Sequence, residues 1–363
     1  MHALDRYRNT RDHWSELAPD FSQTMNTKDL AVDLNAKQRY ATLLAMQYDF
    51  QEIDKELVRY LFAQEIDSLI NDDTSGTTYS LKLGAYLLAS YRDPLDIPSF
   101  YKAKNIDMDT HGGFDTEFMY WALGRGTFDY IRSHFPDLYE DIKDEEENDR
   151  FFQRLDSWWT SLCEQYPTHP ASESDYTMYE RHLYFGDLEQ ARIHIENWAK
   201  NCRDERDVSV TLKYAYKALG AYREVIKILE VNLSQAKPGW DKISVISDLL
   251  QMYVGLNSPP EAFVYFAQAD AELSTFDDWK SLGLGRMLVH AAFEYAALCD
   301  DDQLAISSCG FALSWCQELT SHHYTLLVAG EKATRRCQLI SLAEDFRQKT
   351  ETERQRIDAL FRK

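Results

Sequence analysis

The segment 107–118 comes closest in this sequence to a metal-binding pattern. Counted from Asp107, oxygen-bearing side chains stand at positions 1, 3 and 9, and a glycine stands at position 6. Calcium loops use this spacing, because carboxylates supply ligands and the glycine allows a sharp turn. Position 12 is Phe118 instead of a bidentate glutamate, and position 5 is His111, a poor calcium ligand. We therefore predict that Asp115 caps the following helix and that the segment binds no metal.

Other clusters of reactive residues also lack the spacing that their chemistry needs. The aspartates at 72–73 and 300–302 do not have the D-D-x-x-D spacing of magnesium–diphosphate sites, and they suit helix ends instead. Residues 283–285 lack the third glycine of a dinucleotide-binding loop and predict a helix start, while the histidines at 322–323 predict a surface turn. No metalloprotease, serine-hydrolase or phosphate-loop motif occurs. We predict a protein that is not an enzyme and needs no cofactor.

One enzyme class stays open at this point. A glycoside hydrolase on a helical barrel needs two carboxylates at a set separation, and that separation is a property of the structure. The many aromatic residues, 13% of the chain, would suit sugar stacking, although the chain has few glycines for the loops of such a barrel.

Charge and composition narrow the class of partner. The 363 residues include 60 acidic and 39 basic side chains, a formal net charge of −21. Nucleic acids and anionic membranes both select basic surfaces, so neither is an expected partner. The expected partner is a protein or peptide, and a basic one, because opposite charge speeds encounter.

The compartment is predicted from three further features of the sequence. The N-terminus has no apolar run of the length that a secretory signal needs, and no stretch is long enough to predict a membrane-spanning helix. The six cysteines include no C-x-x-C pair and suit free thiols in a reducing environment. We therefore expect a cytoplasmic protein.

Hydrophobic periodicity predicts an all-α fold. Helices are expected at 51–70, 78–91, 114–124, 127–134 and 137–165, and the low numbers of glycine (14) and proline (9) disfavour a turn-rich β protein. In the first of these helices one apolar stripe contains Ile53, Leu57, Leu61, Ile66 and Leu69. The polar segment 166–175, with two prolines, predicts a linker. We therefore expect an acidic N-terminal helical region at 1–165 and a second region at 170–363.

The second region contains an internal echo. Gly186 and Gly220 are 34 residues apart, and each follows the expected end of a helix. Five residues after each glycine comes a small residue, Ala191 or Val225, and four residues later an aliphatic one. Small residues let antiparallel helices approach closely. Weaker copies are expected around Ala262 and Ala305.

This pattern resembles the tetratricopeptide repeat, a 34-residue helical hairpin. The second copy is similar to the family's L-G-x-Y-x-x-A core, with Val225 in place of alanine, and the likeness covers about 175–320. The copies depart from the family at Tyr179 and Lys213, where a small residue is usual. The resemblance implies a helical-hairpin array whose first helices line a partner-binding groove. Carried over by position, the groove residues are Tyr176, Glu180, Leu183, Tyr184, Val210, Tyr214, Lys217 and Ala218.

These observations favour a non-catalytic protein- or peptide-binding protein. One role is an acidic, immunity-type partner that neutralises a basic protein. The alternatives are a peptide-sensing regulator and the helical-barrel hydrolase. Residues 1–150 contain 29 acidic and 16 basic side chains, so the excess of acid is heaviest before the echo begins. The acidic surface and the groove are therefore expected to be different faces.

Overall fold

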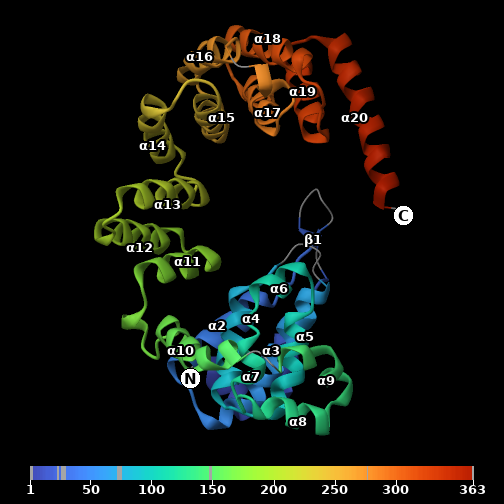
Figure 1. Cartoon of the computed structure of the whole chain (residues 1–363). Helices are drawn as coiled ribbons and strands as arrows, with labels where there is room; N and C mark the ends of the chain where they lie inside the picture. The colour runs from blue at the N-terminus through green and yellow to red at the C-terminus, as the bar shows by residue number, and fades with distance from the viewer. Residues whose placement is uncertain are drawn as a thin grey trace. The chain divides into compact units, whose positions relative to one another are not determined.

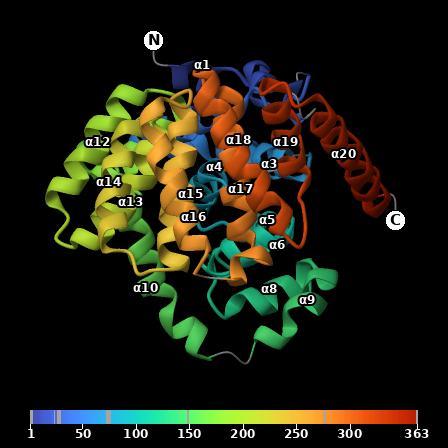
Figure 2. The same ribbon diagram turned by 90° about the horizontal axis from the view of Figure 1, so that it is seen from above.

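A computed structural model of the chain describes residues 3–22, 24–25, 30–71, 76–146, 149–275 and 277–361. The chain divides into two compact units, Met1–Ser174 and Asp175–Lys363, called here the N-terminal and C-terminal units. Helices dominate both of them (Figures 1 and 2). The predicted all-α class is confirmed. The aspartates at 72–73 lie outside the described residues.

The N-terminal unit is a bundle of short and medium-length helices in which α4 packs against both α2 and α3. The strands described in it are one antiparallel pair of two residues each, in which Thr24 pairs with Ala31. In chain order the elements are α1 (Ala3–Asn9), η1 (Arg11–Leu17), β1 (Thr24–Met25), β2 (Leu30–Ala31), α2 (Ala36–Tyr48), η2 (Glu52–Asp54), α3 (Lys55–Asn71), α4 (Tyr79–Ser90), η3 (Pro94–Asp96), α5 (Ile97–Lys104), α6 (Met108–Gly113), α7 (Glu117–Tyr120), α8 (Gly126–His134), α9 (Pro136–Ile142), η4 (Lys143–Glu145), α10 (Asp149–Gln165) and η5 (Pro170–Ser172).

The helix predicted at 51–70 corresponds to α3, which begins later than expected, at Lys55. Leu57, Leu61, Ile66 and Leu69 are buried on α3, as the apolar stripe predicts. Ile53 is 72% exposed, because it lies in the separate 3-10 turn η2 that precedes α3. The prediction that Ile53 belongs to the buried stripe is therefore wrong.

The calcium-like segment is helical and its aspartates have structural roles. Asp107 caps α6, where its carboxylate accepts a hydrogen bond from the Thr110 amide at 2.7 Å. Asp115 does not cap α7, because Thr116 holds that position and the Asp115 carboxylate accepts from the Trp158 indole of α10 at 2.9 Å. The predicted helix at 114–124 is likewise wrong in extent. The α-helical part is α7 alone, and turns follow it.

Aromatic side chains attach α10 to the rest of the N-terminal unit. The Trp159 ring stacks on Trp121 at 4.5 Å between ring centres and on Tyr86 of α4 at 5.4 Å. The Trp158 ring meets Phe118 of α7 edge-on at 5.1 Å. The predicted helix at 137–165 is in fact divided into α9, η4 and α10, and these ring contacts belong to the last of them.

A charged cluster is buried between α2, α3 and α4. The Arg39 guanidinium is fully buried and donates to the Glu65 carboxylate at 2.6 Å, to Asp33, and to the Leu17 carbonyl at 3.3 Å. The hydroxyl of Ser68 donates to Asp33 at 2.7 Å, and a further serine of α4 donates to Glu65. Buried charges persist only when paired and hydrogen-bonded, so this cluster ties three segments of the unit together.

The C-terminal unit is a succession of helix pairs, and the two helices of each pair pack together. The pairs are α11 (Asp175–Phe185) with α12 (Leu188–Asn201), α13 (Glu205–Ala218) with α14 (Tyr222–Gln235), α15 (Trp240–Gly255) with α16 (Val264–Leu273), α17 (Gly283–Leu298) with α18 (Asp302–Glu318), and α19 (Tyr324–Arg336) with α20 (Ile340–Phe361). Two 3-10 turns, η6 (Pro260–Phe263) and η7 (Asp277–Lys280), precede α16 and α17. Figure 1 shows α15, α17 and α19 side by side in one layer, with α16 and α18 in a second.

The positions of the internal echo have matching environments in the structure. Gly186 and Gly220 form the turns within the first two pairs at φ +85° and +68°, a conformation that favours glycine. The four small or branched residues of the echo are all buried, with exposed fractions of 0% or 1%: Ala191, Val225, Ala262 and Ala305. The residues four positions after them are equally buried: Ile195, Leu229, Phe266 and Cys309. These positions form the seam between the helices of each pair.

The third copy has its turn later than the echo predicts. Gly255, which aligns near the glycines of the first two copies, is the last residue of α15. The turn follows it, at Asn257 (φ +61°) and Ser258 (φ +55°). Gly255 has a packing role instead, because a Cβ there would lie 2.7 Å from the Tyr222 ring.

Bonds between residues about one repeat apart join successive pairs. The Tyr265 hydroxyl donates to Glu230 at 3.0 Å, 35 residues earlier. The Tyr295 hydroxyl donates to the Pro259 carbonyl at 2.9 Å, 36 residues earlier. Contacts of this constant separation are expected when each pair stacks on its neighbour.

Replacing Gly220 with alanine is expected to lower the free energy of unfolding by about 1 kcal/mol, because a side chain at φ > 0 is strained. Gly310 provides the control, since it lies inside α18 and a Cβ there meets no atom within 4 Å. Gly310→Ala should stabilise the protein by about 0.5–1 kcal/mol through helix propensity. Urea denaturation followed by circular dichroism measures both changes. Equal effects of the two substitutions would contradict the assigned turn.

Candidate binding surface

The first helices of the pairs place the predicted groove residues. On α11 the Tyr176 side chain is 37% exposed, and its ring lies 5.8 Å from that of Tyr179 and 5.7 Å from that of Trp198 on α12. Burial raises the pKa of the Tyr176 hydroxyl, and the Glu180 carboxylate raises it further. Tyr176 therefore offers one part of its ring to solvent and uses the other to hold α11 on α12.

The remaining predicted residues of α11 are more enclosed. Glu180 and Tyr184 are half-buried, and the Tyr184 ring meets Phe185 edge-on at 5.4 Å between ring centres. Leu183 packs against the small buried cluster of Tyr179, Ala191, Ile195 and Ala215. Leu183 is thus half-buried and packs within the hairpin, and its role as a groove residue stays a prediction.

The predicted residues of α13 form an open face. Val210 is 50% exposed and Tyr214 is 61% exposed, and Lys217 and Ala218 are exposed as well. These residues recur every three or four positions, so they lie along one side of the helix. Such a run of apolar and aromatic side chains, ending in a cation, is suited to contact with another chain.

Lys213 connects this face of α13 to α15. Its ammonium group lies 4.8 Å from the centre of the Tyr214 ring and 3.2 Å from the Asp248 carboxylate of α15. The contact fixes the Tyr214 ring next to an ion pair that is only partly exposed. Asp248 lies about one helical turn before Gln251, so both residues are on the same side of α15. Gln251 lines a cavity in the C-terminal unit.

A cavity of about 270 Å³ opens between α15, α17 and α19. Gln251 contributes to its wall from α15, and Arg286, Met287 and His290 contribute from α17. The wall is completed by Gly283, His323, Thr325 and Leu326. Met287 is 50% exposed, which gives the cavity an apolar wall beside its polar groups.

The charge of this cavity differs from that of the chain as a whole. Its lining residues include one arginine and two histidines but no aspartate or glutamate. The Arg286 guanidinium donates to the Ser321 hydroxyl at 3.2 Å, and His290 lies 3.4 Å from the Glu294 carboxylate. The wall therefore suits a neutral or acidic group of a partner.

The sequence indicates two parts of this cavity but not that they come together. The histidines at 322–323 were predicted as a surface turn and residues 283–285 as a helix start, and α17 does begin at Gly283. His323 and Arg286 are 37 residues apart, and only the packing of α17 against α19 brings them to one cavity. The signal available in the sequence was the repeat spacing of about 35 residues.

The carboxylates that are buried among the described residues all lie in the N-terminal unit. Those of the N-terminal unit are each bonded to an arginine: Asp33 and Glu65 to Arg39, Asp54 to Arg8, and Asp96 to Arg59. Burial would raise the pKa of Asp33, but hydrogen bonds from Arg39 and Ser68 hold it below its ordinary value. Burial does raise the pKa of Glu65. These carboxylates act as counter-ions for guanidinium groups.

Among the described residues, no group of three or more histidine, cysteine, aspartate or glutamate side chains is placed to hold a metal ion. The aspartates at 300–302 lie at the start of α18, where Asp301 accepts hydrogen bonds from the amides of Gln303 and Leu304. No helix of the described part combines the length and the apolar character needed to cross a bilayer.

Comparison of the chain with protein-family models, curated proteins and solved structures found no match to any of them.

Proposed function

We propose that this chain is a non-catalytic protein- or peptide-binding protein whose C-terminal unit is a tetratricopeptide-like array. The exposed face of α13, with Val210, Tyr214 and Lys217, is the observation that carries the proposal. Large apolar side chains that remain half exposed in a regular row are suited to be covered by a partner. Lys213, next to this row, pairs with Asp248 of α15, and α15 also contributes Gln251 to the cavity that Arg286 lines.

Charge supports a basic partner for the protein as a whole. The N-terminal unit contains 32 acidic and 17 basic side chains, which gives −15 of the total of −21. Such an excess attracts a cationic partner over roughly a Debye length, ~8–10 Å at physiological salt. The role that fits both features is an acidic neutralising partner of a basic protein, in which charge guides encounter and the α13 face makes close contact.

Tyr214→Ala is expected to weaken partner binding by at least about tenfold, because exposed aromatic residues at interface centres commonly contribute more than 1 kcal/mol. Tyr176→Ala should weaken binding less, since part of that ring packs on Trp198. The assay is capture of proteins from native lysate on the immobilised full-length chain, followed by titration of the recovered protein.

Val231→Ala supplies the matched control. Val231 is 57% exposed and lies on α14, the second helix of its pair. The substitution therefore removes an exposed apolar side chain that is not part of the α13 face. Capture should be unchanged by this substitution, and circular dichroism should show the same helix content in all variants. Equal capture by Tyr214→Ala and the unmodified chain would remove the α13 face from the proposal.

A further inference from the structure

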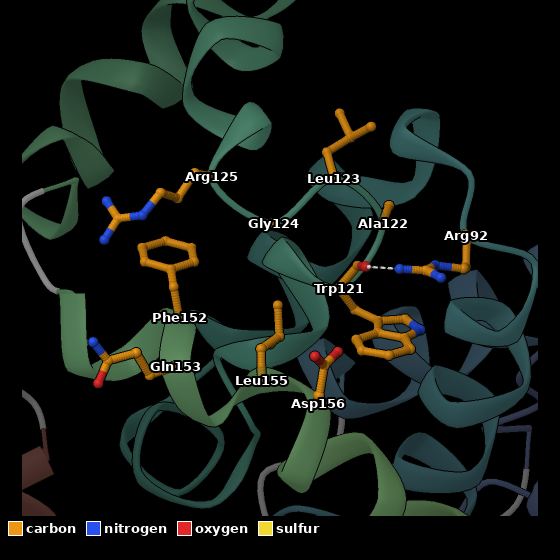
Figure 3. Close-up of a pocket in the computed structure, with 10 residues that line it drawn as sticks. All are labelled: Arg92, Trp121, Ala122, Leu123, Gly124, Arg125, Phe152, Gln153, Leu155 and Asp156. Carbon is orange, nitrogen blue, oxygen red and sulfur yellow. Dashed lines mark hydrogen bonds between the residues drawn. The ribbon is translucent and has the colours of Figure 1, made fainter.

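The N-terminal unit contains a second cavity, of about 750 Å³, in which Figure 3 shows the Arg92 and Arg125 side chains on opposite sides and Asp156 between them. Both guanidinium groups bind the chain itself. Arg92 donates to the Trp121 carbonyl at 3.3 Å, and Arg125 donates to the Glu146 carbonyl at 3.3 Å. These arginines therefore have contacts within the unit, and the reactive groups that the proposed function leaves unused lie elsewhere, among the cysteines.

Three of the six cysteines come together in the C-terminal unit. Cys299 follows α17, Cys309 lies in α18 and Cys337 follows α19, and all three are buried free thiols. The Cys309 thiol donates a hydrogen bond to the Cys337 sulfur. These two sulfurs are therefore neighbours, although 28 residues separate them in the sequence.

The two thiols differ in how readily they lose a proton. Burial and the adjacent Cys337 sulfur raise the pKa of Cys309 to about 12. Burial raises the pKa of Cys337 as well, but the hydrogen bond from Cys309 and the Arg336 guanidinium oppose that rise. Arg336 is held there by the Asp302 carboxylate at 2.7 Å and the Cys299 carbonyl at 3.2 Å. Because the thiolate is the reactive form of cysteine, Cys337 is the sulfur of this pair that reacts first.

A bond between these sulfurs would join successive helix pairs. Cys309 belongs to the pair α17–α18, whereas Cys337 lies in the turn between α19 and α20, the last pair that the structure describes. In a stacked array such a pair contacts a neighbour on one side only. Helix α19 also contributes Thr325 and Leu326 to the cavity that Arg286 lines. A covalent link would therefore hold the last pair in place and, with it, one wall of that cavity.

We propose that Cys309 and Cys337 are a redox pair, which hydrogen peroxide closes to a disulfide that stabilises the last helix pair, and which a dithiol reopens. The Cys337 thiolate attacks the peroxide, the O–O bond breaks, and Cys337 becomes a sulfenic acid while hydroxide takes up a proton and leaves as water. The Cys309 sulfur then attacks the Cys337 sulfur. The S–S bond forms, the S–O bond breaks, and the oxygen leaves with the Cys309 proton as a second water, so the two sulfurs give two electrons to the peroxide.

Disulfide mapping on the full-length chain tests the proposal. The reduced protein is incubated with hydrogen peroxide, blocked with N-ethylmaleimide and digested without reduction. Mass spectrometry is expected to find the Cys309–Cys337 linked peptide as the main disulfide, with the other four cysteines blocked, and dithiothreitol should remove it. Its rate of formation should rise between pH ~7 and pH ~9, because the raised pKa of Cys337 leaves little thiolate at neutral pH.

Thermal unfolding measures the effect of the bond on the fold. Oxidation should raise the melting temperature of the unmodified chain by about 5–10 °C, as closure of a loop of this length gives. Cys309→Ala should abolish both the linked peptide and this rise. Cys316→Ala is the matched control, since Cys316 is a buried cysteine seven residues later on the same helix, and this variant should keep both.

The outcomes separate this inference from the proposed function. A main link between Cys299 and Cys337, a link between two chains, or blocked thiols at both Cys309 and Cys337 after peroxide treatment would overturn it. A melting temperature that does not rise on oxidation, or that rises equally in Cys309→Ala, would also overturn it. None of these results depends on Tyr214 of the α13 face, so either proposal can fail while the other stands.

Discussion

Replacing Arg39 with leucine is expected to lower the free energy of unfolding of the N-terminal unit by about 3–5 kcal/mol. The substitution leaves the Asp33 and Glu65 carboxylates, 8% and 2% exposed, without their cation. Removing one partner of a buried pair costs more than the pair contributes, because the remaining charge is left uncompensated in a poorly solvated site. Urea denaturation followed by circular dichroism and tryptophan fluorescence measures the loss.

Arg347→Leu is the matched control, since its salt bridge to Glu344 joins side chains that are 61% and 46% exposed. Exposed pairs of this kind contribute only about 0–1 kcal/mol. A loss below about 1 kcal/mol for Arg39→Leu would mean that water reaches the cluster and that it is not a buried ionic tie.

The pH dependence of the same variant checks the cause. Burial raises the pKa of Glu65 even with Arg39 present, and removing the cation should raise it further. A carboxyl whose folded-state pKa is raised stabilises the fold when protonated, and that stability is lost as pH rises through the folded pKa. The deficit of Arg39→Leu should therefore be smaller at pH ~5 than at pH ~8. A deficit that does not change over this range would point to lost packing instead of unpaired charge.

Gly285→Ala should have the second-largest effect, a loss of about 1–3 kcal/mol in the C-terminal unit. A Cβ at this position would lie 2.2 Å from the carbonyl oxygen of Trp279 in η7, and backbone cannot rotate away as a side chain can. Trp279 is itself 2% exposed, so the shift would disturb the core around it.

Gly283 makes the comparison direct, because it is two residues earlier on the same helix. A Cβ there would lie no closer than 3.7 Å to a neighbour, the Arg286 guanidinium. Gly283→Ala should be neutral or slightly stabilising, by up to about 1 kcal/mol, at the start of α17. Thermal unfolding of the two variants gives the comparison. If Gly285→Ala is as stable as Gly283→Ala, α17 does not approach η7 as closely as described.

These glycines illustrate how far the sequence could predict the structure. The run 283–285 correctly indicated a helix start, because local propensity and capping act over a few residues. It could not indicate that one of the two glycines touches the Trp279 backbone, because that contact depends on how η7 packs against α17.

Helix boundaries, too, could be predicted only in part from the sequence. Leu57, Leu61, Ile66 and Leu69 share a buried face because their spacing follows the helical period. Ile53 also fits that spacing but is exposed, since the chain forms a separate turn before α3. Periodicity defines the face of a helix, but other interactions determine where the helix begins.

For the candidate surface, helical spacing in the sequence was enough to predict the row on α13 and the seam of the helix pairs. Val210, Tyr214 and Lys217 share a face through helical spacing, and the buried positions from Ala191 to Ala305 follow from the echo. The two cavities could not be predicted in this way, because they form where helices that are distant in the sequence pack together. Arg286 and His323 line one cavity, and Arg92 and Asp156 line the other, because separate helices pack together. Net charge is a sum over the chain, so it could predict an acidic protein but not the places where arginine side chains line a cavity.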